Sequence, residues 1–146
     1  PLPGNTQDEA FLYVYDEIVP PLLEWYRPEV LLCQFGIDGH VDDPLVGLAL
    51  TTKTYETLAR SLHGHSHRLC EGRLLLFGGG GYNVDTTAKC WVLLFLIISG
   101  SLQESTSNYR ELLDEDAEVE VDNTMDQVKN ITRAIKRTVF KIHGIR

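Results

Sequence analysis

Apolar and polar positions along the chain predict helices separated by two short strands. The runs 30–35 and 73–77 are short, mainly apolar and followed closely by glycine, which is typical of strands buried on both faces of a sheet. Helices are expected over about 7–25, 52–70, 85–99 and 123–144. This order favours an α/β fold with parallel strands joined by helical crossovers and followed by a C-terminal amphipathic helix.

The sequences of the first and third predicted helices indicate where the first helix begins and bends and how the third is buried. Thr6 and Glu9 match a capping box, so the first helix is expected to begin near Gln7. Pro20-Pro21 is expected to kink or break it, because proline lacks an N–H and clashes with the preceding turn. The 90–98 part of the third helix is apolar all round, which predicts burial on every side.

The predicted sheet is too small to stand alone. A parallel sheet with only two visible strands cannot cover its own faces and edges. The sequence also begins at Pro1, and its only methionine is Met125, so either an initiator methionine is removed before proline or the sequence is a piece of something longer. We therefore expect a missing portion or a partner, and predict that the chain dimerises through the sheet region or pairs with another polypeptide.

Composition narrows the functional classes. The net charge of -8 argues against a nucleic-acid partner, which requires clustered Lys and Arg. The longest apolar run is too short to span a bilayer, and the N-terminus lacks the basic flank of a secretory leader. The spacing of Cys33, Cys70 and Cys90 does not match a disulfide framework. This indicates buried thiols in a reducing compartment, and hence a cytoplasmic location.

The glycine run 78–81, followed by Tyr82, is the most informative motif. Four glycines provide no side-chain packing and cost chain entropy, so a bare backbone is needed there, either for a closely approaching ligand or for positive φ angles at a tight turn. Ligands of open α/β sheets bind outside the carboxyl ends of the strands, so Tyr82 is expected to point into a site. A tight turn with Tyr82 packed in the core is the alternative. A phosphate loop is disfavoured because the Lys and Ser/Thr of a Walker motif are absent.

The residues after the first strand offer candidate metal ligands. If the chain stays extended there, Asp38 and His40 share a face and could begin a Zn²⁺ site. The alternative is a turn aspartate and a surface histidine. His63 and His67 lie one helical turn apart, but a solvated helix face is the preferred interpretation. The acidic stretch 114–120 is interpreted as a solvated loop, because it lacks the ligand spacing of a calcium site.

Several ordered motifs resemble the second half of the zinc-dependent histone deacetylase superfamily, and within it the acetoin-utilisation (AcuC) type. The resemblance is clear from Pro1 to about Ser99 and vague after Gly100. The motifs that carry it are Pro1-Leu2-Pro3 with Asp8-Glu9, Gln34-x-Gly36-x-Asp38-x-His40-x-x-Asp43-Pro44-Leu45, Leu50-Thr51-Thr52, Gly78-Gly79-Gly80-Gly81-Tyr82 and Ala88-Lys89-Cys90-Trp91.

This resemblance implies an arginase/deacetylase-like α/β fold and a set of site residues. Asp38 matches a metal-binding aspartate, whereas His40 matches a family histidine that is not a ligand. Tyr82 matches the tyrosine that hydrogen-bonds the substrate carbonyl and then the oxyanion. Leu45 matches an apolar position beside the acyl-lysine tunnel, and Gly80 and Gly81 would let the acetyl group lie against the backbone.

The resemblance also implies that the site is incomplete. The family's other metal ligands and its His-His general base lie in the first half, which is absent here. On this interpretation residues 1–100 are the C-terminal half of a deacetylase-like domain, 101–122 an acidic irregular segment and 123–146 a C-terminal helix. The complete enzyme would use Zn²⁺ to hydrolyse acetyl-lysine or a small acetylated amine, whereas this chain alone would not bind Zn²⁺ tightly. The rival hypothesis is a non-catalytic, self-associating α/β module.

Overall fold

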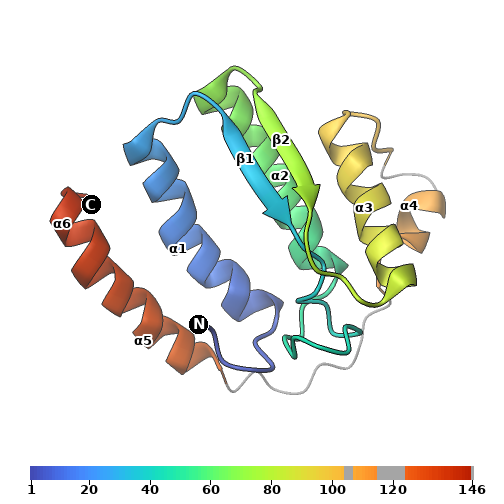
Figure 1. The fold of residues 1–146 in the computed structure, drawn as a ribbon, viewed down its shortest axis with the longest axis horizontal. Coiled ribbons are helices and arrows are strands. Elements are labelled where there is room, and N and C mark those ends of the chain that lie inside the picture. The colour runs from blue at the N-terminus through green and yellow to red at the C-terminus, as the bar shows by residue number, and fades with distance from the viewer. Residues whose placement is uncertain (104–106, 115–123, 146) are drawn as a thin grey trace.

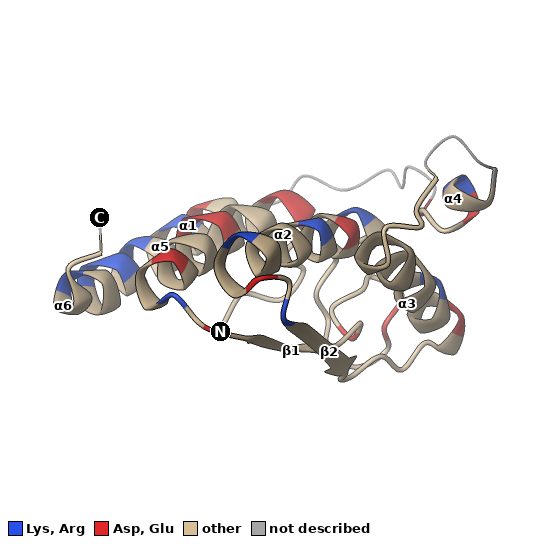
Figure 2. Ribbon diagram, turned by 90° about the horizontal axis from the view of Figure 1, so that it is seen from above, with Lys and Arg blue, Asp and Glu red and all other residues tan. Residues whose placement is uncertain are grey.

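The computed structural model describes residues 1–103, 107–114 and 124–145 of the chain. It has two layers, with all the larger helices on one face of a small parallel sheet (Figures 1 and 2). This arrangement confirms the α/β class expected from the alternating pattern. None of the described helices combines the length and the apolar character needed to cross a membrane.

The helices and strands follow the predicted order closely. The elements are α1 (Asp8–Tyr26), β1 (Leu31–Phe35), α2 (Thr52–Cys70), β2 (Leu74–Gly78), α3 (Val84–Ile98), α4 (Ser107–Glu111), α5 (Met125–Ile135), the π-helical turn η1 (Lys136–Phe140) and α6 (Lys141–His143). The short helix α4 lies within the stretch predicted to be irregular. The π-helical turn joins α5 to α6, so the C-terminal helix is nearly continuous.

The two strands pair in parallel, and α2 is the crossover between them. Leu31 pairs with Leu74 and Phe35 with Gly78, so the carboxyl ends of both strands lie at the same edge. This register places the loop after β1 beside the glycine run after β2. Strand pairing therefore brings the segments that carry the predicted site residues together.

Helix α1 differs from the prediction in two respects. It continues past Pro20 and Pro21 to Tyr26, so the prolines do not break it. Each proline removes only its own N–H donor, and α1 packs against both α2 and α5, which hold it in place. The capping box is also wrong, because the Thr6 hydroxyl donates to the Pro3 carbonyl at 2.7 Å and the helix begins at Asp8 without a side-chain cap.

The core lies between the sheet, α2 and α3. Phe35 and Ile37 from the first strand and its extension pack against Tyr55 of α2 and Leu93 of α3, all nearly inaccessible to solvent. Cys70 and Cys90 are buried, as predicted, whereas Cys33 is half-buried. Burial raises the pKa of the Cys90 thiol to about 12.

The opposite face of the sheet is bare, which corrects the prediction of strands buried on both faces. The side chains of Leu32, Leu75 and Phe77 are 64%, 56% and 45% exposed. No element within 1–103, 107–114 or 124–145 packs on that face (Figure 2). Helix α3 also exposes Phe95 and Val92, so it is not buried all round. The apolar pattern predicts more buried surface than the described residues provide.

Candidate functional site

Two loops meet where β1 and β2 end. The N–H of Ile37 donates to the Gly80 carbonyl at 2.7 Å, which extends the strand pairing beyond both strands. The loop after β1 carries Asp38 and Leu45, and the loop after β2 carries the glycine run and Tyr82. All five predicted site residues therefore lie on two adjoining loops.

The glycine run is needed because the two loops touch. A Cβ atom at Gly80 would lie 2.1 Å from Oδ2 of Asp38, so only glycine leaves room for that carboxylate. A Cβ at Gly79 would lie 3.0 Å from the Cα atom of Gly36. Gly81 has a φ of +142°, a conformation that L side chains rarely adopt. The positive φ that the sequence predicted is present at Gly81, whereas the close contacts at Gly79 and Gly80 are made by the chain itself and not by the ligand that was expected.

Asp43 ties the two loops together. Its buried carboxylate accepts the N–H of Tyr82 at 2.8 Å through Oδ2, and those of Leu45 and Val46 at 2.9 and 3.3 Å through Oδ1. Burial alone would raise the pKa of Asp43, but these three N–H donors and His40 outweigh it and lower the pKa. Asp43 thus stays ionised and holds Leu45 and Tyr82 against one carboxylate.

The side chains of Tyr82 and Leu45 face solvent. Tyr82 is 56% exposed and Leu45 is 68% exposed, although their backbone amides are fixed by Asp43. The alternative that Tyr82 packs in the core is therefore wrong. An exposed hydroxyl and an exposed apolar side chain, both on anchored backbone, are free to contact a bound molecule.

His40 is not arranged as a metal ligand. The chain turns after Ile37, whose carbonyl accepts the His40 N–H at 3.0 Å, so Asp38 and His40 do not follow one another along an extended face. The imidazole is 1% exposed and both ring nitrogens are engaged. Nδ1 accepts the N–H of Asp42 at 3.1 Å, so Nε2 carries the proton that is donated to Asp114 at 3.0 Å.

Asp114 is a residue whose role sequence reasoning missed. Its carboxylate accepts the N–H of Thr52 at 2.6 Å, at the first turn of α2, while its own N–H donates to the Thr52 hydroxyl at 2.8 Å. Burial opposes ionisation, but His40 and Thr52 outweigh it and lower the pKa of Asp114 to about 2. The interpretation of 114–120 as solvated loop is therefore wrong at Asp114, and 115–120 lie outside the described residues.

The described side chains near Asp38 do not provide enough ligands for a complete metal centre. Nowhere in the described parts of the chain do three His, Cys, Asp or Glu side chains cluster so that they could hold an ion. Asp38 supplies one carboxylate. His63 and His67 lie on one face of α2 with ring centroids 4.6 Å apart, but they form only a pair. A four-coordinate zinc site requires more protein ligands than Asp38 provides.

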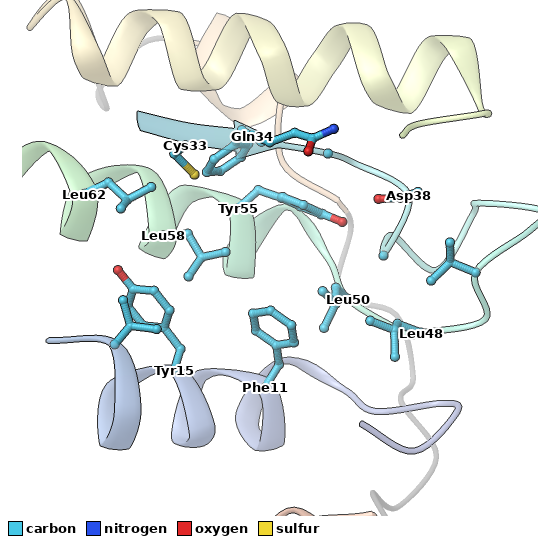
Figure 3. Close-up of a pocket in the computed structure, with 15 residues that line it drawn as sticks. Phe11, Tyr15, Cys33, Gln34, Asp38, Leu48, Leu50, Tyr55, Leu58 and Leu62 are labelled. Carbon is cyan, nitrogen blue, oxygen red and sulfur yellow. The ribbon is translucent and has the colours of Figure 1, made fainter. Parts of the chain in front are cut away.

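A cavity of about 390 Å³ opens beside the site (Figure 3). It lies between α1, β1 and α2, and Asp38 stands at one end. Most of its lining is apolar, including Phe11, Tyr15 and Leu58. The sequence pattern did not predict this cavity, because the cavity depends on the position of α1 relative to the sheet.

Comparison with known proteins gives a consistent result. Residues 1–98 match the model of the histone deacetylase domain. The chain is 36% identical over 117 residues to "Histone deacetylase 14, chloroplastic" of Arabidopsis thaliana, which covers 79% of this chain and 28% of that protein. It is 33% identical over 101 residues to the "Acetoin utilization protein AcuC" of Bacillus subtilis, covering 68% of this chain and 26% of that protein.

The fold has a counterpart among solved structures. The crystal structure of the HDA15 HD domain superposes with a TM-score of 0.62 at 18% identity, over 99% of this chain and 37% of that one. At this identity the likeness concerns the fold alone. The chain spans about a quarter of the length of the curated relatives it matches.

Proposed function

The chain belongs to the histone deacetylase domain family, and from this premise we propose that it contributes one part of the catalytic site of a metal-dependent deacetylase. The observation that carries the proposal is the pair of loops at the carboxyl ends of β1 and β2. On these loops Gly80 leaves room for the Asp38 carboxylate, Asp43 fixes the backbone of Tyr82, and the Tyr82 side chain remains exposed. This edge of a parallel sheet is where α/β enzymes bind their ligands.

Tyr82 is the proposed catalytic residue. Its hydroxyl would donate a hydrogen bond to the carbonyl oxygen of an acetylated amine, and more strongly to the oxyanion that forms when the amide is attacked. Because the Tyr82 N–H is fixed on buried Asp43, the phenol is held on a defined backbone. Losing one such donor costs roughly a hundredfold to a thousandfold in rate.

Asp38 is the proposed metal-binding residue, with Zn²⁺ as the metal implied by the family. Since the described residues do not complete the site, we place the other ligands and the general base on a further polypeptide segment. The chain by itself would then be inactive. The same proposal divides the chain into segments 1–100, 101–122 and 123–146. It also includes a cytoplasmic location, which the three free thiols support.

Leu45, Gly80 and Gly81 are the proposed substrate-binding residues. Leu45 offers an exposed apolar side chain to the aliphatic stem of an acyl-lysine or a small acetylated amine. Gly80 and Gly81 would contact the acetyl group through their backbone, on a side other than the one where a Cβ would meet Asp38 or Thr87. The arrangement suits an acylated amine with a slender apolar stem.

The proposal is tested by complementation. The chain is co-expressed with the part of Bacillus subtilis AcuC that precedes the segment it matches, and deacetylation of acetyl-lysine peptides is measured. We expect activity only in the complex, and a kcat about a hundredfold lower with little change in KM for Tyr82→Phe. Tyr26→Phe, at another exposed tyrosine, is the control. A Tyr82→Phe complex with normal kcat would remove Tyr82 from the mechanism.

A second candidate function rests on the bare sheet face. Leu32, Leu75 and Phe77 together expose apolar surface that two copies of the chain could bury against each other. On this alternative the chain is a non-catalytic module that forms a homodimer. Sedimentation at micromolar concentration distinguishes the two functions. A homodimer that does not dissociate to bind the AcuC segment would favour the non-catalytic module.

A further inference from the structure

A segment beyond the matched domain reaches back to the site loops. The match to the histone deacetylase domain covers 1–98, whereas Asp114 lies after α4. The Tyr109 hydroxyl of α4 donates to both carboxylate oxygens of Glu56 on α2, at 3.0 and 2.9 Å, and Leu112 packs against the core. These contacts hold the segment on the helix layer, so the Asp114 carboxylate meets the loop after β1 at a defined place.

His40 is the residue of that loop that Asp114 contacts. Its Nε2–H donates to Oδ2 of Asp114 at 3.0 Å, and its Nδ1 accepts the N–H of Asp42 at 3.1 Å. The ring stacks on Tyr55, with centroids 6.1 Å apart and an interplanar angle of 18°. The His40 carbonyl accepts the N–H of Asp43 at 2.9 Å. The imidazole is therefore fixed by Asp114 and in turn fixes the turn that leads to Asp43.

The same turn holds the backbone of the proposed catalytic tyrosine. Oδ2 of Asp43 accepts the Tyr82 N–H at 2.8 Å. The connection from Asp114 to Tyr82 thus consists of hydrogen bonds and one turn of backbone. It is shielded from water, since His40 and Asp43 are 1% and 8% exposed and the Asp114 side chain is 22% exposed. Hydrogen bonds to a charged group are strong, and leaving a buried donor without its acceptor is costly.

We propose that Asp114 and His40 are positioning residues for deacetylation. The Asp114 carboxylate fixes the imidazole of His40, the imidazole fixes the turn 40–43, and Asp43 at the end of that turn places Tyr82 for the transition state. The inference rests on the proposed function, in which the Tyr82 hydroxyl stabilises the oxyanion. Neither positioning residue needs to touch the substrate.

Amide exchange of the isolated chain tests the connection without any activity. Asp114→Ala removes the acceptor of His40, whereas Asp114→Asn keeps a side-chain oxygen at the position that accepts from His40 and Thr52. The reference is the Leu31 N–H, which donates to the Arg73 carbonyl at 2.9 Å at the other end of the sheet.

The quantity measured by NMR is the exchange rate of the Tyr82 N–H divided by that of the reference N–H. We expect this ratio to rise about tenfold in Asp114→Ala, because local opening of the turn exposes the Tyr82 N–H before the sheet opens. It should stay within about twofold of wild type in Asp114→Asn. The Asp114→Ala chain should still fold, since the Val41 N–H continues to donate to the Leu50 carbonyl at 2.8 Å and holds the loop on its other side.

Kinetics of the complex with the AcuC segment provide a second measurement. Asp114→Ala should lower kcat about tenfold and change KM less than about twofold, and Asp114→Asn should restore most of the kcat. In a Tyr82→Phe background, Asp114→Ala should cause no further loss, because the hydroxyl that it positions is gone. Glu111→Ala, which removes an exposed carboxylate from the same segment, is the control and should leave kcat unchanged.

The outcomes separate the two proposals. An unchanged exchange ratio in Asp114→Ala would overturn the positioning role and leave the proposed function standing. An equal loss of kcat from Asp114→Ala with and without the Tyr82 hydroxyl would do the same, because Asp114 would then act on the fold in general. Normal kcat in Tyr82→Phe alone would overturn both.

Discussion

At the scale of single residues, three buried or half-buried carboxylates do most to hold the site loops in place. Asp8, Asp43 and Asp114 each accept backbone N–H groups from distant parts of the chain. A carboxylate that accepts several N–H donors remains ionised and resists displacement. The backbone of Tyr82, which is proposed to act on substrate, is therefore positioned by another acidic residue, Asp43.

Asp114 makes stability depend on acid pH. Its pKa is lowered from 3.8 to about 2 in the folded chain. Because the folded pKa lies below the unfolded one, the stabilisation is complete above about pH 4 and is lost as the pH falls toward 2. Urea denaturation at pH 7 should show Asp114→Asn less stable by on the order of 1–3 kcal/mol, the range for a hydrogen-bonded charge.

The difference between wild type and Asp114→Asn should shrink at pH 2.5, where the wild-type carboxyl is partly protonated. Asp16→Asn, at an exposed carboxylate of α1, is the control and should have little effect at either pH. An equal loss for Asp114→Asn at both pH values would show that the charge on Asp114 does not stabilise the fold.

At the scale of elements, the beginnings of α1 and α2 are joined. Asp8, in the first turn of α1, accepts the N–H and the hydroxyl of Thr51 at 2.8 and 2.6 Å, and the hydroxyl of Thr54 at 2.5 Å. Thr51 is the N-cap residue of α2. A single carboxylate therefore lies at two helix N-termini, where the helix dipoles favour negative charge.

Removing that carboxylate should loosen both helices. Asp8→Ala is expected to destabilise the chain by roughly 1–3 kcal/mol, because it leaves N–H and hydroxyl donors without their acceptor. Thermal unfolding followed by circular dichroism measures the effect. Glu9→Ala removes a neighbouring, exposed carboxylate from the same turn and should cost much less. Equal losses would mean that general charge at the start of α1 matters, and not the link to α2.

At the scale of the whole molecule, the chain has a well-packed side and an open side. The core between the sheet, α2 and α3 is buried, whereas the far sheet face and the space beneath α1 lack a covering layer among the described residues. Asp38, the proposed metal-binding residue, lines the cavity at this open side. Completion of the core and completion of the site would therefore require the same partner.

The isolated chain should not bind zinc tightly. Titration calorimetry with ZnCl₂ is expected to show no stoichiometric binding of micromolar or tighter affinity, because Asp38 supplies one ligand and a zinc site requires several. His67→Gln controls for weak binding by the His63 and His67 pair. A tight one-to-one isotherm that disappears in Asp38→Ala would contradict the idea that the site is incomplete.

The local pattern of the sequence was enough for the secondary structure and for part of the site. Apolar spacing determined the helices and strands, because helix and strand periodicity depend on near neighbours. The glycine run predicted a positive φ angle, which is present at Gly81, but the close approach comes from Asp38 and Gly36 of the chain itself and not from the ligand that was expected. The histone deacetylase resemblance, carried by motifs within 1–99, is confirmed by the match over 1–98.

Only the tertiary structure decided which residues hold the site loops together and which surfaces stay open. Asp43 meets Tyr82 across 39 positions, and Asp114 meets His40 across 74, so no local pattern marks either contact. The apolar pattern records how much surface must be buried, but it does not say by what. Among the described residues, pairing of β1 with β2 alone left one sheet face and the cavity beneath α1 uncovered, because burial depends on which segments are brought together in space.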